Sequence, residues 1–217
     1  MTQQEFQISD ELYIYPTPAG AYYAVSSPHL DPARKLLRSL FQFRSSPRFN
    51  IDSLCDWTDI KDKQEIGDLL NRMQDLGWLQ GCDTLQYVPN GALEDILPNL
   101  LAPLSSQGHA LLADNLGFHI ANKGFNYETA EQLSALSADI TTLHERHMGL
   151  LSHNLGLNSS AWALVDVAGN SQVGFWPIYI GSQRFVLVVG GVPHLNQPVL
   201  ITLIWALSIR YGKGDQL

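Results

Sequence analysis

Three strand-like runs follow one another near the end of the chain with only short turns between them. They cover residues 161–167, 173–180 and 185–189, and each is rich in β-branched, aromatic or other apolar side chains. Strands joined by so few residues have to be antiparallel neighbours, because a parallel connection needs a much longer crossover. The last run, Phe-Val-Leu-Val-Val, lacks polar alternation. The sequence therefore predicts an antiparallel sheet with one strand that is covered on both faces.

A hairpin and a long helix precede these strands. Residues 110–113 and 118–121 are apolar runs on either side of Asp-Asn-Leu-Gly, whose Asn and Gly tolerate the positive φ of a tight turn. Residues 127–151 then place apolar side chains at helical spacing, with Asn126 as the N-cap and an acidic first turn. At 3.6 residues per turn, we expect an amphipathic helix of about six turns.

The long helix carries two rows of side chains that pack differently. One row is a seam of large apolar residues: Leu133, Leu136, Ile140, Leu143 and Leu150. The other row consists of small residues set four apart, and small residues let a second helix approach closely. The strand after the helix would lie at an open edge of the sheet, and pairing it with the same strand of a second copy would close that edge. We therefore expect a homodimer formed through the small row and the next strand, by Ala130, Ser134, Ala138, Ala161, Ala163 and Val165.

The first 88 residues are predicted to form a winged helix-turn-helix-like domain. The helices are indicated by apolar residues at helical spacing and by start signals such as Asp31-Pro32. The expected elements are strands at 12–15 and 21–25, helices at 33–43, 52–57 and 62–76, and a hairpin of 78–80 with 85–88. The Pro-Asn-Gly at 89–91 marks the boundary with a second domain over residues 92–211.

A winged helix commonly binds DNA, so the charge of its helices matters. The segment 61–75 has three basic and four acidic residues, a net charge of −1, and the whole chain has −8. Phosphate contacts need Lys and Arg at the groove. Arg34, Lys35 and Arg38 are expected to point outward from the first helix, where three charges at this spacing usually form a solvated face. We therefore expect no useful affinity for duplex DNA.

Composition and motifs exclude several other classes of protein. The chain has no apolar run of about 18 residues, and the start MTQQEFQISDE lacks the basic and apolar regions of a signal peptide. We therefore expect a cytoplasmic protein that does not enter a membrane. Cys55 and Cys82 belong to no CxxC pair, which argues against a zinc site and for reduced thiols.

No arrangement of residues indicates catalysis. The His-Glu-Arg-His at 144–147 lacks the spacing of HExxH, and neither GxSxG nor the phosphate-binding GxxxxGK[ST] occurs in the chain. We accordingly expect no catalytic, cofactor-binding or metal-binding residues and no enzyme activity.

The second half begins and ends with apolar helical segments, at 93–104 and 198–211. Its order of helix, two strands, long helix, three strands and helix resembles the roadblock/LC7 family over about residues 92–211. The matching stretches are LLADNLGFHIA, the Ala- and Leu-rich helix at 127–151, and the strands WALVDVAGN, FWPIYIG and RFVLVVGG. Pro98 and Pro103 in the first helix and Pro177 in the fourth strand depart from the pattern, which affects the boundaries of these elements more than their order.

The resemblance implies an α+β domain with a five-stranded antiparallel sheet. The long helix would cover one face, and the first and last helices the other. It also implies a homodimer that is a non-catalytic regulator or scaffold of small Ras-like GTPases, as in bacterial polarity and motility systems. On that pattern the candidate contacts on the long helix are Glu131, Asp139, Glu145 and Arg146. The alternative function is a DNA-binding transcriptional regulator, in which the second half dimerises or senses a ligand.

Overall fold

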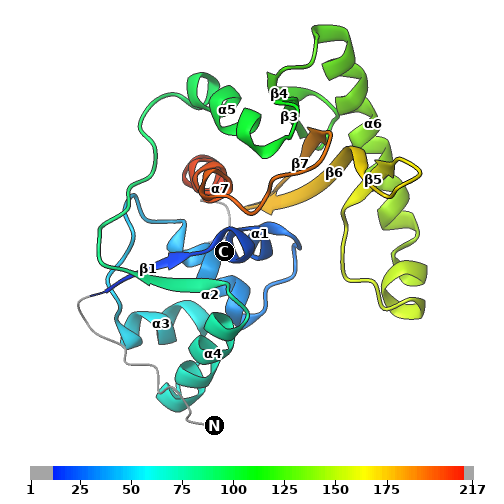
Figure 1. The fold of residues 1–217 in the computed structure, drawn as a ribbon. Helices are drawn as coiled ribbons and strands as arrows, with labels where there is room; N and C mark the ends of the chain where they lie inside the picture. Colours follow the sequence, from blue (N-terminus) through cyan, green and yellow to red (C-terminus); the bar gives the residue numbers. More distant parts are fainter. Residues whose placement is uncertain (1–11, 213–217) are drawn as a thin grey trace.

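The computed structural model describes residues 12–212, which form two parts connected between Cys82 and Leu93 (Figure 1). The N-terminal part contains β1 (Tyr13–Pro16), α1 (Pro18–Val25), α2 (Pro32–Leu40), α3 (Ile51–Thr58), α4 (Lys63–Asp75) and β2 (Leu79–Cys82). The C-terminal part contains α5 (Leu93–Leu101), a 3₁₀ turn (Ala102–Leu104), β3 (Ala110–Asp114), β4 (His119–Lys123), α6 (Tyr127–Arg146), a π-helical turn (Gly149–Asn154), β5 (Trp162–Val165), β6 (Ser171–Ile180), β7 (Gln183–Gly190) and α7 (Pro198–Tyr211).

The C-terminal strands form one five-stranded antiparallel sheet in the order β4-β3-β7-β6-β5. This confirms the predicted sheet, its hairpin and its three consecutive strands. Pro177 lies within β6, opposite Val186 of β7. Since β5 pairs with β6 only as far as Phe175, the missing N–H of Pro177 falls where β6 has no neighbour on its other side.

The two faces of the sheet are covered by different helices, as expected. On β7, the side chains of Phe185, Leu187 and Val189 belong to the core beneath α5 and α7. Val186 and Val188 lie on the opposite face, in a smaller core beneath α6. The strand thus sends alternate side chains into two cores, which explains why its sequence shows no polar alternation.

The helix expected at 93–104 is divided, as its prolines suggested. The α-helix α5 includes Pro98 and ends at Leu101, and Ala102–Leu104 continue as a 3₁₀ turn that contains Pro103.

The predicted strand at 21–25 is wrong, because this segment belongs to helix α1. Thr17 caps the helix by accepting the N–H of Gly20 on its hydroxyl at 3.1 Å, and Pro18 occupies the first helical position. Gly20, Ala21 and Ala24 then form a buried face at helical spacing. The tyrosines between them gave the segment a strand-like composition, but the cap and the small face determine its structure.

The predicted hairpin of 78–80 with 85–88 does not form. Strand β2 pairs instead with β1, with Cys82 opposite Tyr13 and Leu79 opposite Pro16. Tyr87 makes only an isolated bridge to Ser45. The helices α2, α3 and α4 keep the predicted order, while β1 takes the place beside β2 that the second strand of a wing would occupy.

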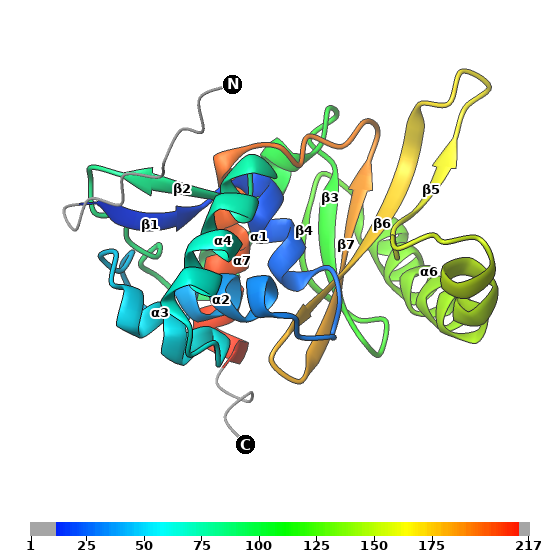
Figure 2. The ribbon, with the colours of Figure 1, turned by 90° about the horizontal axis from the view of Figure 1, so that it is seen from below.

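One hydrophobic core runs through both parts of the molecule. It contains residues of α1, α2 and α4 together with residues of α5, α7 and the sheet. Trp205 of α7 donates its indole N–H to the carbonyl of Phe43 at 2.8 Å, and its ring lies 5.9 Å from that of Tyr15. Figure 2 shows the resulting layers, from the N-terminal helices through α7 and the sheet to α6.

Candidate protein-interaction surface

Helix α6 packs on the sheet with its small side chains. Ala130, Ser134, Ser137 and Thr141 are buried, and Ala130 belongs to the core beneath the helix. The hydroxyls of Ser134 and Thr141 donate to the carbonyls four residues earlier at 2.8 Å, so burying them leaves no donor unpaired. Ala130 and Ser134 are therefore inside the protomer. The prediction that they contact a second copy is wrong for this fold.

Part of the leucine seam of α6 lies away from the sheet. Leu136 is 44 % exposed, Leu143 is 41 % exposed, and Leu150, just beyond the helix, is 49 % exposed. Leu133 and Ile140 are only half-buried against the core beneath the helix. The small row thus faces the protein's own sheet, while Leu136, Leu143 and Leu150 of the leucine seam are left exposed.

The leucine seam faces the β5 edge of the sheet. On one flank of the buried face, His144 accepts the indole N–H of Trp162 from β5 on its Nδ1 at 3.1 Å. On the other flank, Gly117 of the β3–β4 turn lies close to Ser134 and Ala138. With about 100° between successive helical residues, Leu136 and Leu143 fall on the His144 flank.

Strand β5 is an edge of the sheet and is largely exposed. Ala163, Leu164 and Val165 are exposed, and Ala161, just before the strand, is half-buried. Leu164 is 66 % exposed and, by strand alternation from Trp162, lies on the face that carries α6. We call the combination of Leu136, Leu143, Leu150 and Leu164 with the free edge of β5 the α6–β5 surface.

Of the four charged candidates, Glu131 and Glu145 lie on the Gly117 flank of α6, whereas Asp139 and Arg146 lie on its outer side, next to Leu143. Glu131, Asp139, Glu145 and Arg146 are all exposed. Glu145 makes an ion pair with Arg184 of β7, a residue that the sequence did not single out. Glu131 accepts a hydrogen bond from the hydroxyl of Tyr127, and this bond raises the pKa of Tyr127. The helix therefore presents an apolar flank toward β5, and charged side chains on its outer side and on the flank toward the β3–β4 turn; we call these two regions together its charged flank.

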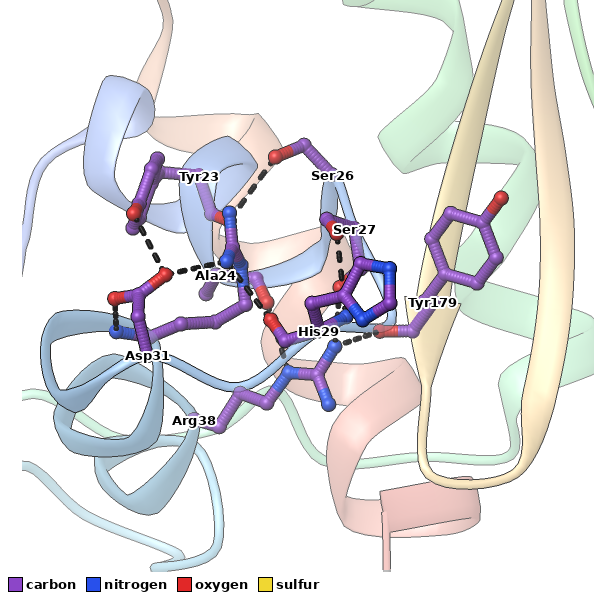
Figure 3. A network of polar contacts seen from close by, with 9 residues as sticks. Tyr23, Ala24, Ser26, Ser27, His29, Asp31, Arg38 and Tyr179 are labelled. Carbon is purple, nitrogen blue, oxygen red and sulfur yellow. Dashed lines mark hydrogen bonds and ion pairs between the residues drawn. The ribbon is translucent and has the colours of Figure 1, made fainter. Parts of the chain in front are cut away.

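Two basic residues that were expected to point outward are turned inward instead. Arg34 is buried, pairs with Asp31, and donates to the carbonyls of Tyr23 at 3.0 Å and His29 at 2.8 Å. Figure 3 shows this network. The pKa of Tyr23 is raised by burial and by the hydrogen bond that its hydroxyl donates to Asp31.

Arg38 belongs to the same network. It donates to the carbonyls of Ala24 and Ser27 at 2.8 Å each and to that of Tyr179 in β6 at 3.4 Å (Figure 3). Of the three predicted surface cations, Lys35 keeps an exposed partner, Asp59. The first helix thus offers a phosphate backbone much less positive charge than its sequence suggests.

The described part of the chain shows no arrangement for metal binding or membrane crossing. Within residues 12–212, no three His, Cys, Asp or Glu residues are grouped so that they could hold a metal ion. No helix in that range is long and apolar enough to cross a bilayer.

Comparisons with known proteins add structural matches. No protein-family model and no curated protein matches the chain. Among solved structures, the match to a roadblock/LC7 domain from Streptomyces avermitilis has 13 % identity and a TM-score of 0.35, and covers 55 % of this chain and 93 % of that one. The match to MglB from Myxococcus xanthus has 19 % identity and a TM-score of 0.31, and covers 54 % of this chain and 92 % of that one. The match to the gliding protein MglB from Thermus thermophilus has 16 % identity and a TM-score of 0.33, and covers 58 % of this chain and 95 % of that one.

Proposed function

We propose that this protein is a dimeric, non-catalytic regulator or scaffold that binds a small Ras-like GTPase through its C-terminal part. The observation that carries the dimer is the α6–β5 surface, where exposed leucines lie beside an unpaired strand edge. An open edge invites pairing, and a two-fold axis would bring together two β5 strands and two leucine seams in one step. The charged flank of α6 would stay accessible in such a dimer.

Charged residues at the centre of this surface should prevent dimer formation. In the double variant Leu136→Lys, Leu143→Lys, each copy would bring two ammonium groups into the seam, where their desolvation opposes association. We expect wild type to be a dimer at micromolar concentration by light scattering, and the double variant to dissociate at least about tenfold more readily. Leu76→Lys at the end of α4, where Leu76 is 47 % exposed, is the control and should remain dimeric. A monomeric wild type would refute the proposal.

The proposed GTPase contact rests on the order of elements and on the charged flank of α6. The order from α5 to α7 is the one that the roadblock/LC7 resemblance implies, and the chain has no P-loop motif with which to hold a nucleotide itself. The inward-facing Arg34 and Arg38 weigh against the alternative of a DNA-binding regulator. We therefore propose that the N-terminal part is a winged helix-like domain without a wing, and that it serves in protein contacts.

Purification of the tagged protein from its native host distinguishes these functions, because a co-eluting GTPase and co-eluting DNA are separable at once. Calorimetry with that GTPase, loaded with GDP or a GTP analogue, should show binding, while the protein alone should release no phosphate from GTP. The variant Asp139→Lys, Arg146→Glu keeps the net charge and should slow association several-fold, because rim charges steer encounters. Asp56→Lys, Lys61→Glu on the N-terminal part is the matched control. Failure to bind either nucleotide state would remove GTPase regulation.

A further inference from the structure

A cavity in the N-terminal part lies between the start of α2, the helix α4 and Trp78. Its volume is about 340 Å³, and its walls include the apolar Leu69 and Met73, the aromatic Trp78 and Tyr23, and the carboxylate of Asp31. Pockets for small molecules occupy roughly 300–1,000 Å³ and combine mostly apolar walls with a few polar groups. This cavity fits the lower end of that range. Neither α6 nor β5 contributes a residue to it.

The aromatic wall of the cavity is held firmly in place. The backbone N–H of Trp78 donates to the carbonyl of Met73 at 2.8 Å, and its carbonyl accepts the N–H of Thr17 at 3.1 Å. The Trp78 ring stacks on Tyr23, with the ring centroids 3.8 Å apart. The guanidinium of Arg34 lies over the Tyr23 ring, 4.2 Å from its centroid. Because the wall is fixed before any ligand arrives, binding would cost little side-chain ordering.

The charges around the cavity leave an excess of positive charge. The carboxylate of Asp31 is already engaged, since it pairs with Arg34 and accepts hydrogen bonds from the Tyr23 hydroxyl and from the backbone of α2. Arg72 also lines the cavity, is exposed, and makes no ion pair with any of residues 12–212. Its guanidinium is therefore the uncompensated charge at this cavity.

We propose that this cavity binds a small organic anion whose carboxylate is held by Arg72 and whose ring or short hydrocarbon part lies against Leu69, Met73 and Trp78. A guanidinium matches a carboxylate with two parallel N–H···O bonds, which fixes the orientation of the anion as well as its charge. The apolar wall supplies the remaining contact area, and the stacked Trp78 favours a planar group. The site is independent of the proposed GTPase contact.

The test uses benzoate, phenylacetate and hexanoate as probes at millimolar concentration against the full chain. At least one should raise the thermal midpoint and change Trp78 fluorescence, a signal that Trp78→Phe should remove. Arg72→Gln should weaken binding by at least about tenfold, while Arg72→Lys should lose less. Arg48→Gln is the matched control, because Arg48 also lies near an aromatic ring, that of Tyr13, but outside the cavity. Circular dichroism shows whether each variant is folded.

Neutral analogues separate an anion site from a merely apolar one. Benzamide and phenylacetamide have nearly the shape of two of the probes but no charge, so they should bind at least about tenfold more weakly. The proposal is overturned if folded wild type binds none of the three anions. It is equally overturned if the amides bind as well as the acids, or if Arg72→Gln binds as well as wild type.

Discussion

Gly20 allows the backbones of two segments, α1 and the residues after α4, to pack in close contact. The helix α1 passes so close to the end of α4 that a Cβ built on Gly20 would lie 1.9 Å from the carbonyl oxygen of Trp78. That oxygen is fixed, because it accepts the N–H of Thr17. The backbone approach is possible only for glycine, since the obstacle is main chain and cannot rotate away.

Replacing Gly20 should therefore destabilise the protein despite its helical position. We expect Gly20→Ala to lower the free energy of unfolding by about 1–3 kcal/mol, the usual range for overpacking, as measured by urea denaturation. Gly67→Ala is the matched control, because Gly67 also lies within a helix, α4, and a Cβ there meets nothing within 4 Å. The control should raise stability by about 0.4–1 kcal/mol. Equal effects of the two substitutions would contradict this account.

Arg34 and Arg38 show where residue-level reasoning from the sequence fails. Their spacing in the chain is that of a solvated helix face, which is the usual outcome. In the fold, Arg34 donates to the carbonyl of Tyr23 and Arg38 to that of Ala24, and both carbonyls belong to the last turn of α1, where acceptors lack partners further along the helix. The orientation of the arginines is determined by the carbonyls at the end of another helix, α1, which require donors. The sequence around the arginines carries no sign of those carbonyls.

At the scale of elements, periodicity predicted α6 and its cap but not which row is buried. Asn126 accepts the N–H of Thr129, as the cap prediction required. The buried row contains Ser134, Ser137 and Thr141, which look unsuitable for a core until their hydroxyls are seen to bond to carbonyls of the same helix. The seam of leucines is larger and more apolar, so it was the natural choice for the core. Close approach to the sheet favoured the smaller row.

For the N-terminal part, the prediction of strand pairing was wrong. Helices α2, α3 and α4 were predictable from capping residues and apolar spacing, because those signals are local, whereas α1 was predicted as a strand. Strand pairing is not local, and the turn at 81–84 looked like a hairpin signal, whereas β2 pairs with β1, more than 60 residues earlier in the chain. A strand chooses its partner by what else packs nearby, and the sequence of the strand itself does not specify that partner.

At the scale of the whole molecule, α7 explains why the two parts share one core. Its sequence is apolar almost all round, which predicted burial against the sheet or a partner. In the structure it is buried against the sheet together with α5, and α1 of the same chain covers it in turn. The molecule is thus a series of layers, each of which buries the apolar face of the next. The last layer is α6, whose Leu136 and Leu143 remain exposed.

The junction between α1 and the sheet should make stability fall at alkaline pH. Burial, together with the nearby Tyr179 for Tyr22 and the nearby Cys82 for Tyr15, raises the pKa of both tyrosines to about 12. A pKa raised above its unfolded value of 10.0 means that stability is full below pH 10 and is lost as pH rises toward 12. Tyr22→Phe should make this loss shallower in urea unfolding followed at pH 8, 10 and 11, whereas Tyr87→Phe, at an exposed position, should not. Identical slopes for wild type and Tyr22→Phe would show that the buried phenol does not control the alkaline transition.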